Sequence, residues 1–143
     1  MSFTLDLSRA CEAMKGRTDL VVRKVLLDLG TSLVMKSPVG DATLWKSAPP
    51  AGYAGGHFRG NWQHGFGSAP SGELPDIDPS GSASMSRIES GVASSLAAGI
   101  HYLANNLPYA QRLEDGWSSQ APAGMMELTL IEFPGIVKRS AQA

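Results

Sequence analysis

The chain has 143 residues, of which 43% are apolar and 17% are charged, and its formal net charge is −1. This length suffices to bury a core, so we expect one soluble domain over residues 1–143. The near-neutral charge argues against a protein that grips nucleic acid through bulk electrostatics. The one cysteine, Cys11, excludes an internal disulfide and favours a reducing compartment. Since no apolar run reaches about 18 residues, we expect no membrane-spanning segment.

Apolar residues at steps of three and four predict a long helix over residues 4–36. They are Leu7, Ala10, Cys11, Met14, Val21, Val25, Leu29 and Leu33. Ser37-Pro38 ends this helix, because a residue before proline is pushed out of the helical region. Gly16 lies inside it at a cost of roughly 1 kcal/mol relative to alanine, which leaves a bend there open. Such a helix is roughly 45–50 Å long, so we expect it to pack partly against a neighbouring chain.

Two stretches without apolar periodicity interrupt the chain, residues 38–60 and residues 67–82. Loops of more than about 15 residues are uncommon in compact domains unless they are functional or disordered. We therefore predict that both loops become ordered only against partners. The second loop carries a small acidic run, which consists of Glu73, Asp76 and Asp78.

Two short apolar runs predict a small antiparallel sheet. Residues 61–66 form one strand, with Trp62 as its apolar anchor, and residues 100–104 form the other. Between them, apolar residues on one helical face predict a helix over residues 84–96, capped by Ser82 or Ser84.

The region after the second strand is dense in local signals. Pro108 suits the start of a short helical turn, and Gly116 suits a left-handed cap at its end. Residues 117–122 then form a polar elbow. Residues 123–143 fit a strand over a short stretch, but Met126, Leu130, Phe133 and Val137 fit a longer helical pattern, which predicts a helix kinked at Pro134. The predicted fold is therefore α+β, with a long N-terminal helix and a C-terminal helix packed on a small antiparallel sheet.

A search for catalytic groups finds no convincing set. The three histidines, His57, His64 and His101, lack the tight spacing of zinc ligands, and His101 is expected on the exposed side of a strand. No phosphate-binding loop and no nucleophile elbow occurs. Glu114 and Asp115 are adjacent and point apart on a helical turn, so we expect Glu114 to bind a positive group or a backbone amide. We expect no enzyme, no cofactor and no metal.

Four short motifs carry a resemblance to a known family. They are Ser37-Pro38-Val39, Phe58-Arg59-Gly60-Asn61-Trp62-Gln63, Asn105-Asn106-Leu107-Pro108-Tyr109-Ala110 with Leu113-Glu114-x-Gly116, and Gln120-Ala121-Pro122-x-Gly124-Met125. With them, the chain resembles the small tail-component proteins of long-tailed bacteriophages, called neck, head–tail joining or tail-completion proteins. The match runs from Lys36 to Val137. It departs from the family pattern after Val39, where the usual Asp-Thr-Gly is missing and an inserted stretch reaches Gly56.

The resemblance implies a structural protein of the virion, assembled in the bacterial host cytoplasm, with no catalytic activity. Such proteins form a homo-oligomeric ring in the neck, between the portal with its connector proteins and the tail tube. The implied partners are further copies of the chain, the connector or stopper proteins, and the tail terminator or tail tube. DNA passes through the ring without sequence-specific binding, and no membrane is involved. Two alternatives stay open: a tail-terminator ring that caps the tube, and a small host-directed binding protein that acts as a monomer.

Several side chains are candidates for contacts with other proteins, because aromatic groups in loops are common interface anchors. The interface candidates are Trp45, Tyr53, Phe58, Trp117, Gln120 and Pro122. It is equally open that each aromatic anchors its own loop to the core.

Other motif residues are expected to hold the fold together. We assign Trp62 and Tyr109 to the core and expect an ion pair between Arg59 and Glu114. Fixed positive charge would retain DNA phosphates. On that ground, we hypothesise that the acidic run of Glu73, Asp76 and Asp78 faces the channel.

Overall fold

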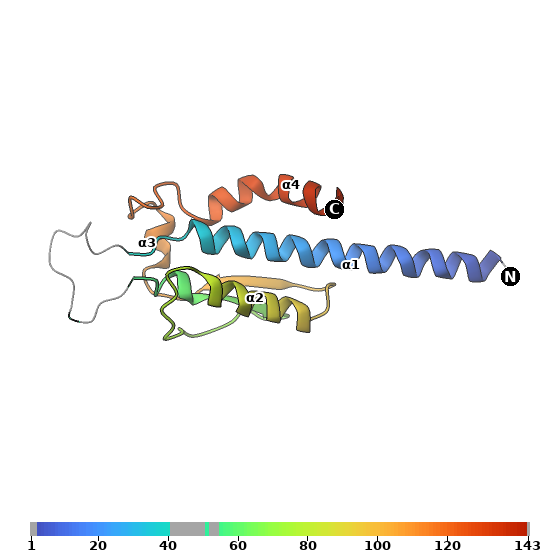
Figure 1. The fold of residues 1–143 in the computed structure, drawn as a ribbon, viewed down its shortest axis with the longest axis horizontal. Coiled ribbons are helices and arrows are strands. Elements are labelled where there is room, and N and C mark those ends of the chain that lie inside the picture. The colour runs from blue at the N-terminus through green and yellow to red at the C-terminus, as the bar shows by residue number, and fades with distance from the viewer. Residues whose placement is uncertain (1–2, 41–50, 52–54, 143) are drawn as a thin grey trace.

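The structure is a computed structural model that describes residues 3–40, 51 and 55–142. Figure 1 shows one long helix with shorter elements gathered around one of its ends. In chain order, the elements are α1 (Phe3–Lys36), the 3-10 turn η2 (Arg59–Asn61), β1 (Trp62–Phe66), α2 (Ser82–Ser94), β2 (His101–Asn105), α3 (Ala110–Glu114) and α4 (Met126–Gln142). The predicted α+β class is confirmed.

Helix α1 dominates the shape of the molecule. It is unbroken over 34 residues and passes through Gly16 without interruption. Its C-terminal half lies between α4 on one side and α2 with the sheet on the other, whereas its N-terminal half extends beyond all of them (Figure 1). Helix α4 therefore packs along α1, and α2 packs against both α1 and β1.

The sheet consists of β1 and β2, which pair antiparallel as predicted, with Trp62 opposite Asn105 and Phe66 opposite His101. Because side chains alternate along a strand, β1 presents different residues to its two faces. His64 points toward α2, where a Cβ on Gly91 would lie 2.6 Å from the His64 ring. The two faces of β1 are thus covered by different parts of the chain.

Residues 67–82 cover the second face of β1, on which Gln63 and Gly65 lie. The amide of Gln63 donates to the Gly72 carbonyl at 3.0 Å. Asn61 exchanges two hydrogen bonds with the backbone of Leu74, at 2.7 and 3.1 Å. Asn106 donates to the carbonyls of Pro70 and Gly72 at 3.0 and 3.1 Å. Side-chain amides thus satisfy the backbone of this loop, so the chain itself holds it, contrary to the prediction.

The first predicted loop, residues 38–60, is described only in part, since residues 41–50 and 52–54 lie outside the described residues. The base of this loop is closed by the N–H of Gly56, which donates to the carbonyl of Val39 at 2.7 Å. A Cβ on Gly55 would lie 2.6 Å from the same carbonyl oxygen, so this close approach requires glycine.

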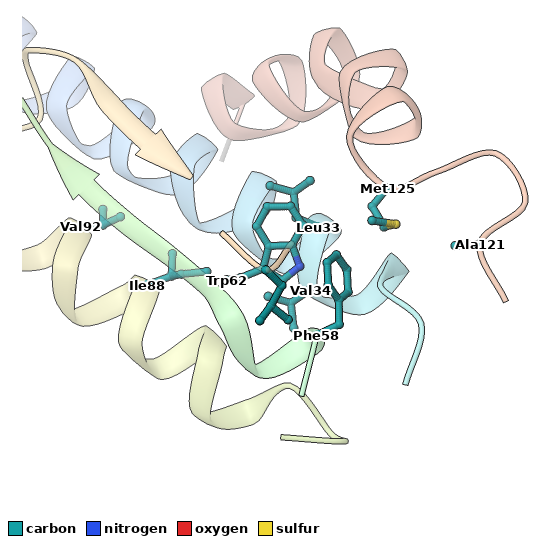
Figure 2. Close-up of a cluster of buried hydrophobic side chains, with 9 residues drawn as sticks. Leu33, Val34, Phe58, Trp62, Ile88, Val92, Ala121 and Met125 are labelled. Carbon is teal, nitrogen blue, oxygen red and sulfur yellow. The ribbon is translucent and has the colours of Figure 1, made fainter. Parts of the chain in front are cut away.

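The core lies where the C-terminal half of α1 meets the sheet, α2 and the start of α4. Its buried members are Leu33, Val34, Phe58, Trp62, Ile88, Val92, Leu107, Ala121 and Met125. Figure 2 shows Trp62 beside the α1 side chains and Phe58, with Ile88 and Val92 reaching in from α2. The Phe58 and Trp62 rings meet edge to face, with their centroids 6.0 Å apart. This geometry adds to the stabilisation that burial of the two rings provides.

Candidate interaction surface

The junction at the end of α1 is built from Ser37, Arg59 and Trp62. The buried indole N–H of Trp62 donates to the Ser37 hydroxyl at 2.7 Å, and that hydroxyl donates to the Leu33 carbonyl at 2.6 Å. The first of these hydrogen bonds satisfies the indole N–H, which is the one polar group of this buried tryptophan. Trp62 is therefore a core residue, as predicted.

Arg59 ties the same junction to the start of α2. Its guanidinium donates to the carbonyls of Ser37 and Pro79, at 2.7 Å in both cases. Burial lowers the pKa of Arg59, and the negative charge of Asp78 partly opposes this shift. The predicted ion pair between Arg59 and Glu114 is wrong, because each side chain binds backbone groups of a different segment.

Glu114 caps the start of α4. Its carboxylate accepts hydrogen bonds from the N–H groups of Met125, Met126 and Glu127, at 3.0, 2.8 and 3.1 Å. These N–H groups have no partner within the helix, and negative charge is favourable at a helix N-terminus. The prediction of a backbone amide as the partner of Glu114 is confirmed. The turn just before α4 requires glycine at position 124. Gly124 has a φ of 79°, and a Cβ there would clash with the Glu114 carboxylate.

The elbow leaves α3 through Gly116, whose φ of 87° confirms the predicted left-handed cap. Trp117 follows with 73% of its surface exposed, and the guanidinium of Arg112 lies 5.2 Å from its ring centroid. The Gln120 side chain accepts a hydrogen bond from the N–H of Val39 at 2.9 Å, and Pro122 is exposed.

A shallow pocket of about 270 Å³ lies between this elbow and the end of α1. Its lining includes Arg59, Gln120 and Pro122. Of the predicted interface residues in the elbow, Gln120 and Pro122 line this pocket, and Trp117 is exposed elsewhere on the elbow.

The other predicted interface residues are placed differently. Phe58 is only 5% exposed and belongs to the core, so its assignment to an interface is wrong. Trp45 and Tyr53 lie outside the described residues. Tyr109 was expected in the core but is exposed, with its ring 6.1 Å from that of Phe58. It follows Pro108 in the turn that leads into α3, so it lies against the core from the outside.

The acidic run does not form a free negative surface. Glu73 is exposed, but the carboxylate of Asp76 pairs with the guanidinium of Arg87 at 2.6 Å. Asp78 is buried and accepts a hydrogen bond from the N–H of Ser84 at 2.8 Å. The hypothesis that all three residues face a channel is therefore wrong for Asp78, and the charge of Asp76 is already paired.

Asp78 instead holds the first turn of α2. Gly81, with a φ of 81°, is the residue before the helix and provides no side-chain cap, so the predicted caps Ser82 and Ser84 are not used. Burial alone would raise the pKa of Asp78. Hydrogen bonds from the backbone of Ser84, from its hydroxyl and from the backbone of Ala83 and Gly81 outweigh this effect and lower the pKa.

A pair of histidines joins the two strands. His64 Nε2 and His101 Nδ1 are 2.9 Å apart, and His101 Nε2 lies 3.0 Å from the Ala97 carbonyl oxygen. A carbonyl only accepts, so the neutral His101 carries its proton on Nε2 and accepts at Nδ1 from His64. His101 is half-buried, which corrects its prediction as an exposed residue. Burial and the proximity of His101 lower the pKa of His64.

Large apolar side chains are also exposed outside the elbow, and two helices carry several of them. Met14 and Leu20 are exposed on the projecting half of α1, and Leu130, Ile131 and Phe133 are exposed on α4. The apolar spacing in α4 was visible in the sequence. Periodicity identifies one face of a helix, but it does not tell whether that face meets the core or water.

The described residues contain no group of three or more His, Cys, Asp or Glu side chains placed to hold a metal ion. Within the same residues, no helix is both long enough and apolar enough to cross a membrane. No protein-family model, no curated protein and no solved structure matches the chain.

Proposed function

We propose that this chain is a structural subunit of a ring in the neck of a long-tailed bacteriophage. The ring completes head–tail joining between the connector and the tail tube, lets DNA pass and performs no catalysis. The observation that carries the proposal is the set of four sequence motifs between Ser37 and Met125, which resembles the neck and tail-completion proteins.

The way in which the motifs meet in space supports this proposal. Ser37 of the first motif binds Trp62 of the second through the indole N–H. Asn105 of the third motif donates to the Phe58 carbonyl of the second at 2.9 Å. The motif residues are thus bonded to one another across long sequence separations. The resemblance therefore rests on residues that hold the fold together, and such a match supports a shared fold better than a match between surface loops would.

A further bond links the motifs at the two ends of the pattern. Gln120 of the last motif accepts from the N–H of Val39 in the first motif. The four motifs therefore meet around one junction, next to the base of the loop at which the chain departs from the family pattern.

Exposed apolar side chains also support a role in contact with other proteins. The projecting half of α1 and the elbow at Trp117 expose large apolar groups. Aromatic and apolar groups of this size are common anchors where proteins bind one another. A net charge of −1 also suits a ring through which DNA slides, because few fixed positive charges are left over to hold phosphates.

The test has two parts. Light scattering over a concentration series should give a ring, or a smaller species that converts to one as the concentration rises. The protein should also bind filled phage heads that carry connectors, and should bind tails that lack a cap more weakly. Binding only to uncapped tails would replace this proposal with the tail-terminator role. A monomer at all concentrations that binds neither particle would overturn it in favour of a host-directed binding protein.

A further inference from the structure

Helix α4 carries a row of apolar side chains that the described part of the chain leaves exposed. The row, here named the α4 stripe, consists of Met126, Leu130, Phe133 and Val137, which are 47%, 66%, 41% and 36% exposed. With 3.6 residues per turn, the four side chains fall within an arc of about 60°. The stripe is therefore one continuous surface along the helix.

The orientation of α4 on α1 is fixed by polar contacts. The hydroxyl groups of Ser32 and Thr129 are hydrogen-bonded at 2.8 Å, and Lys36 pairs with Glu132 at 2.9 Å. Thr129 is buried, as are Ile136 and Ser140. Helix α4 thus buries Thr129, Ile136 and Ser140 and leaves the stripe exposed. Turning the helix to bury the stripe would break these contacts, so the stripe stays open to a surface from outside the described part of the chain.

The spacing of the stripe matches the stripe of a second copy. Its steps are four, three and four residues, which read the same in both directions. When two α4 helices pair antiparallel, Met126 lies opposite Val137 of the second copy, and Leu130 lies opposite Phe133 of the second copy. Steps of three and four are also those that pack as knobs into holes between two helices. The stripe is therefore complementary to itself under a twofold rotation.

The charges beside the stripe favour the same arrangement. Glu127 and Lys138 lie on the same edge of the stripe at opposite ends of α4, and neither makes an ion pair within the described part of the chain. An antiparallel pair brings Glu127 of each copy to the level of Lys138 of the other. A parallel pair would put this edge of the two copies on opposite sides of the contact, so Glu127 and Lys138 would gain no partner there.

We propose that the α4 stripe is the docking surface for α4 of a second copy of this chain, paired antiparallel across a twofold axis. Such a contact uses the same patch on both copies and closes at two. The inference does not depend on the proposed neck function, because a ring is built from contacts between different patches.

The first test removes the stripe. The wild-type chain should form dimers in a sedimentation series, and the double variant Leu130→Glu/Phe133→Glu should be monomeric with an unchanged circular dichroism spectrum. Leu20→Glu is the matched control, because Leu20 is equally exposed but lies on α1, and it should still dimerise. A monomeric wild-type chain would overturn the inference. So would an assembly that survives the double variant, although a surviving ring would leave the neck proposal intact.

The second test reverses charges and keeps the stripe, so it does not depend on a drastic variant folding. Glu127→Lys and Lys138→Glu should each weaken the dimer roughly tenfold, because each puts equal charges at both ends of the contact. An equal mixture of the two variants should recover the wild-type affinity, since every pair in a mixed dimer is again of opposite charge. Failure of the mixture to recover would overturn the antiparallel arrangement and point to a different occupant.

Discussion

The two halves of α1 have the same kind of sequence but different surroundings. Leu33, in the half that α2 and α4 enclose, is 6% exposed, whereas Leu20, in the projecting half, is 70% exposed. The cause is the length of the neighbours, since α1 has 34 residues but α2 has 13 and α4 has 17. Apolar spacing therefore predicts that a helix has an apolar face. How much of that face is buried depends on the length of the helices that pack against it.

The projecting half depends on the enclosed half for its structure. Isolated helices shorter than about 12–15 residues are marginal in water, because the first turn is costly to form. Continuity with the enclosed half removes that cost but supplies no packing. We expect the projecting half to be the less stable of the two until another surface covers it.

The largest expected effect comes from making the same substitution in both halves. Leu33→Ala should lower the free energy of unfolding by about 3 kcal/mol, because it leaves a cavity in the core. Leu20→Ala should change it by less than about 0.5 kcal/mol, since the side chain already faces water. Urea unfolding measures both. Equal losses would show that the projecting half is packed in solution.

A smaller effect is expected where α4 begins, since α4 is one wall of the enclosed half. Glu114→Gln removes the negative charge that accepts three N–H groups and should cost about 1–2 kcal/mol. Asp115→Asn is the control, because Asp115 is exposed and bonds to the Gln111 side chain. Thermal unfolding should separate the two variants, and an equal shift in Tm would contradict the capping role.

The smallest effect compares the two glycines inside α1. A Cβ at Gly16 would meet nothing within 4 Å, but at Gly30 it would lie 3.0 Å from Ile88. Gly16→Ala should raise the helical signal in circular dichroism and leave the unfolding midpoint unchanged.

Gly30→Ala gains the same propensity but crowds the contact between α1 and α2. It should therefore destabilise the protein by about 1 kcal/mol. A stabilising Gly30→Ala would show that this helix crossing has room to adjust, which would weaken the contrast between the two halves.

Most of the secondary structure could be predicted from the sequence. The signals were local: the steps of three and four in α1 and α2, the alternation around Trp62, and the stop at Ser37-Pro38. The order in residues 67–82 could not be predicted, because it rests on the amides of Asn61, Gln63 and Asn106, which act across the fold. Composition alone describes such a segment as a free loop.

The candidate surface could be predicted only in part. Trp117 was predicted as an interface anchor because it is an aromatic residue in the elbow, and the structure leaves it exposed. The assignments of Phe58 and Tyr109 were exchanged: Phe58 was predicted at an interface but is buried, and Tyr109 was predicted in the core but is exposed. Both are aromatic residues next to turns, and only the fold decides which one points inward. The roles of Asp78 and Glu114 as caps depend on helices that begin 4 and 12 residues later, which is beyond the reach of a local motif.

The hydrogen bond from the Gly56 N–H to the Val39 carbonyl fixes the two ends of the intervening stretch. We therefore expect the stability of the fold to depend little on the length of that stretch. The entropic cost of closing a loop rises by only about 0.6 kcal/mol each time its length doubles. The position is therefore a natural point for evolutionary insertion, and an epitope or fluorescent label placed there should leave the domain folded.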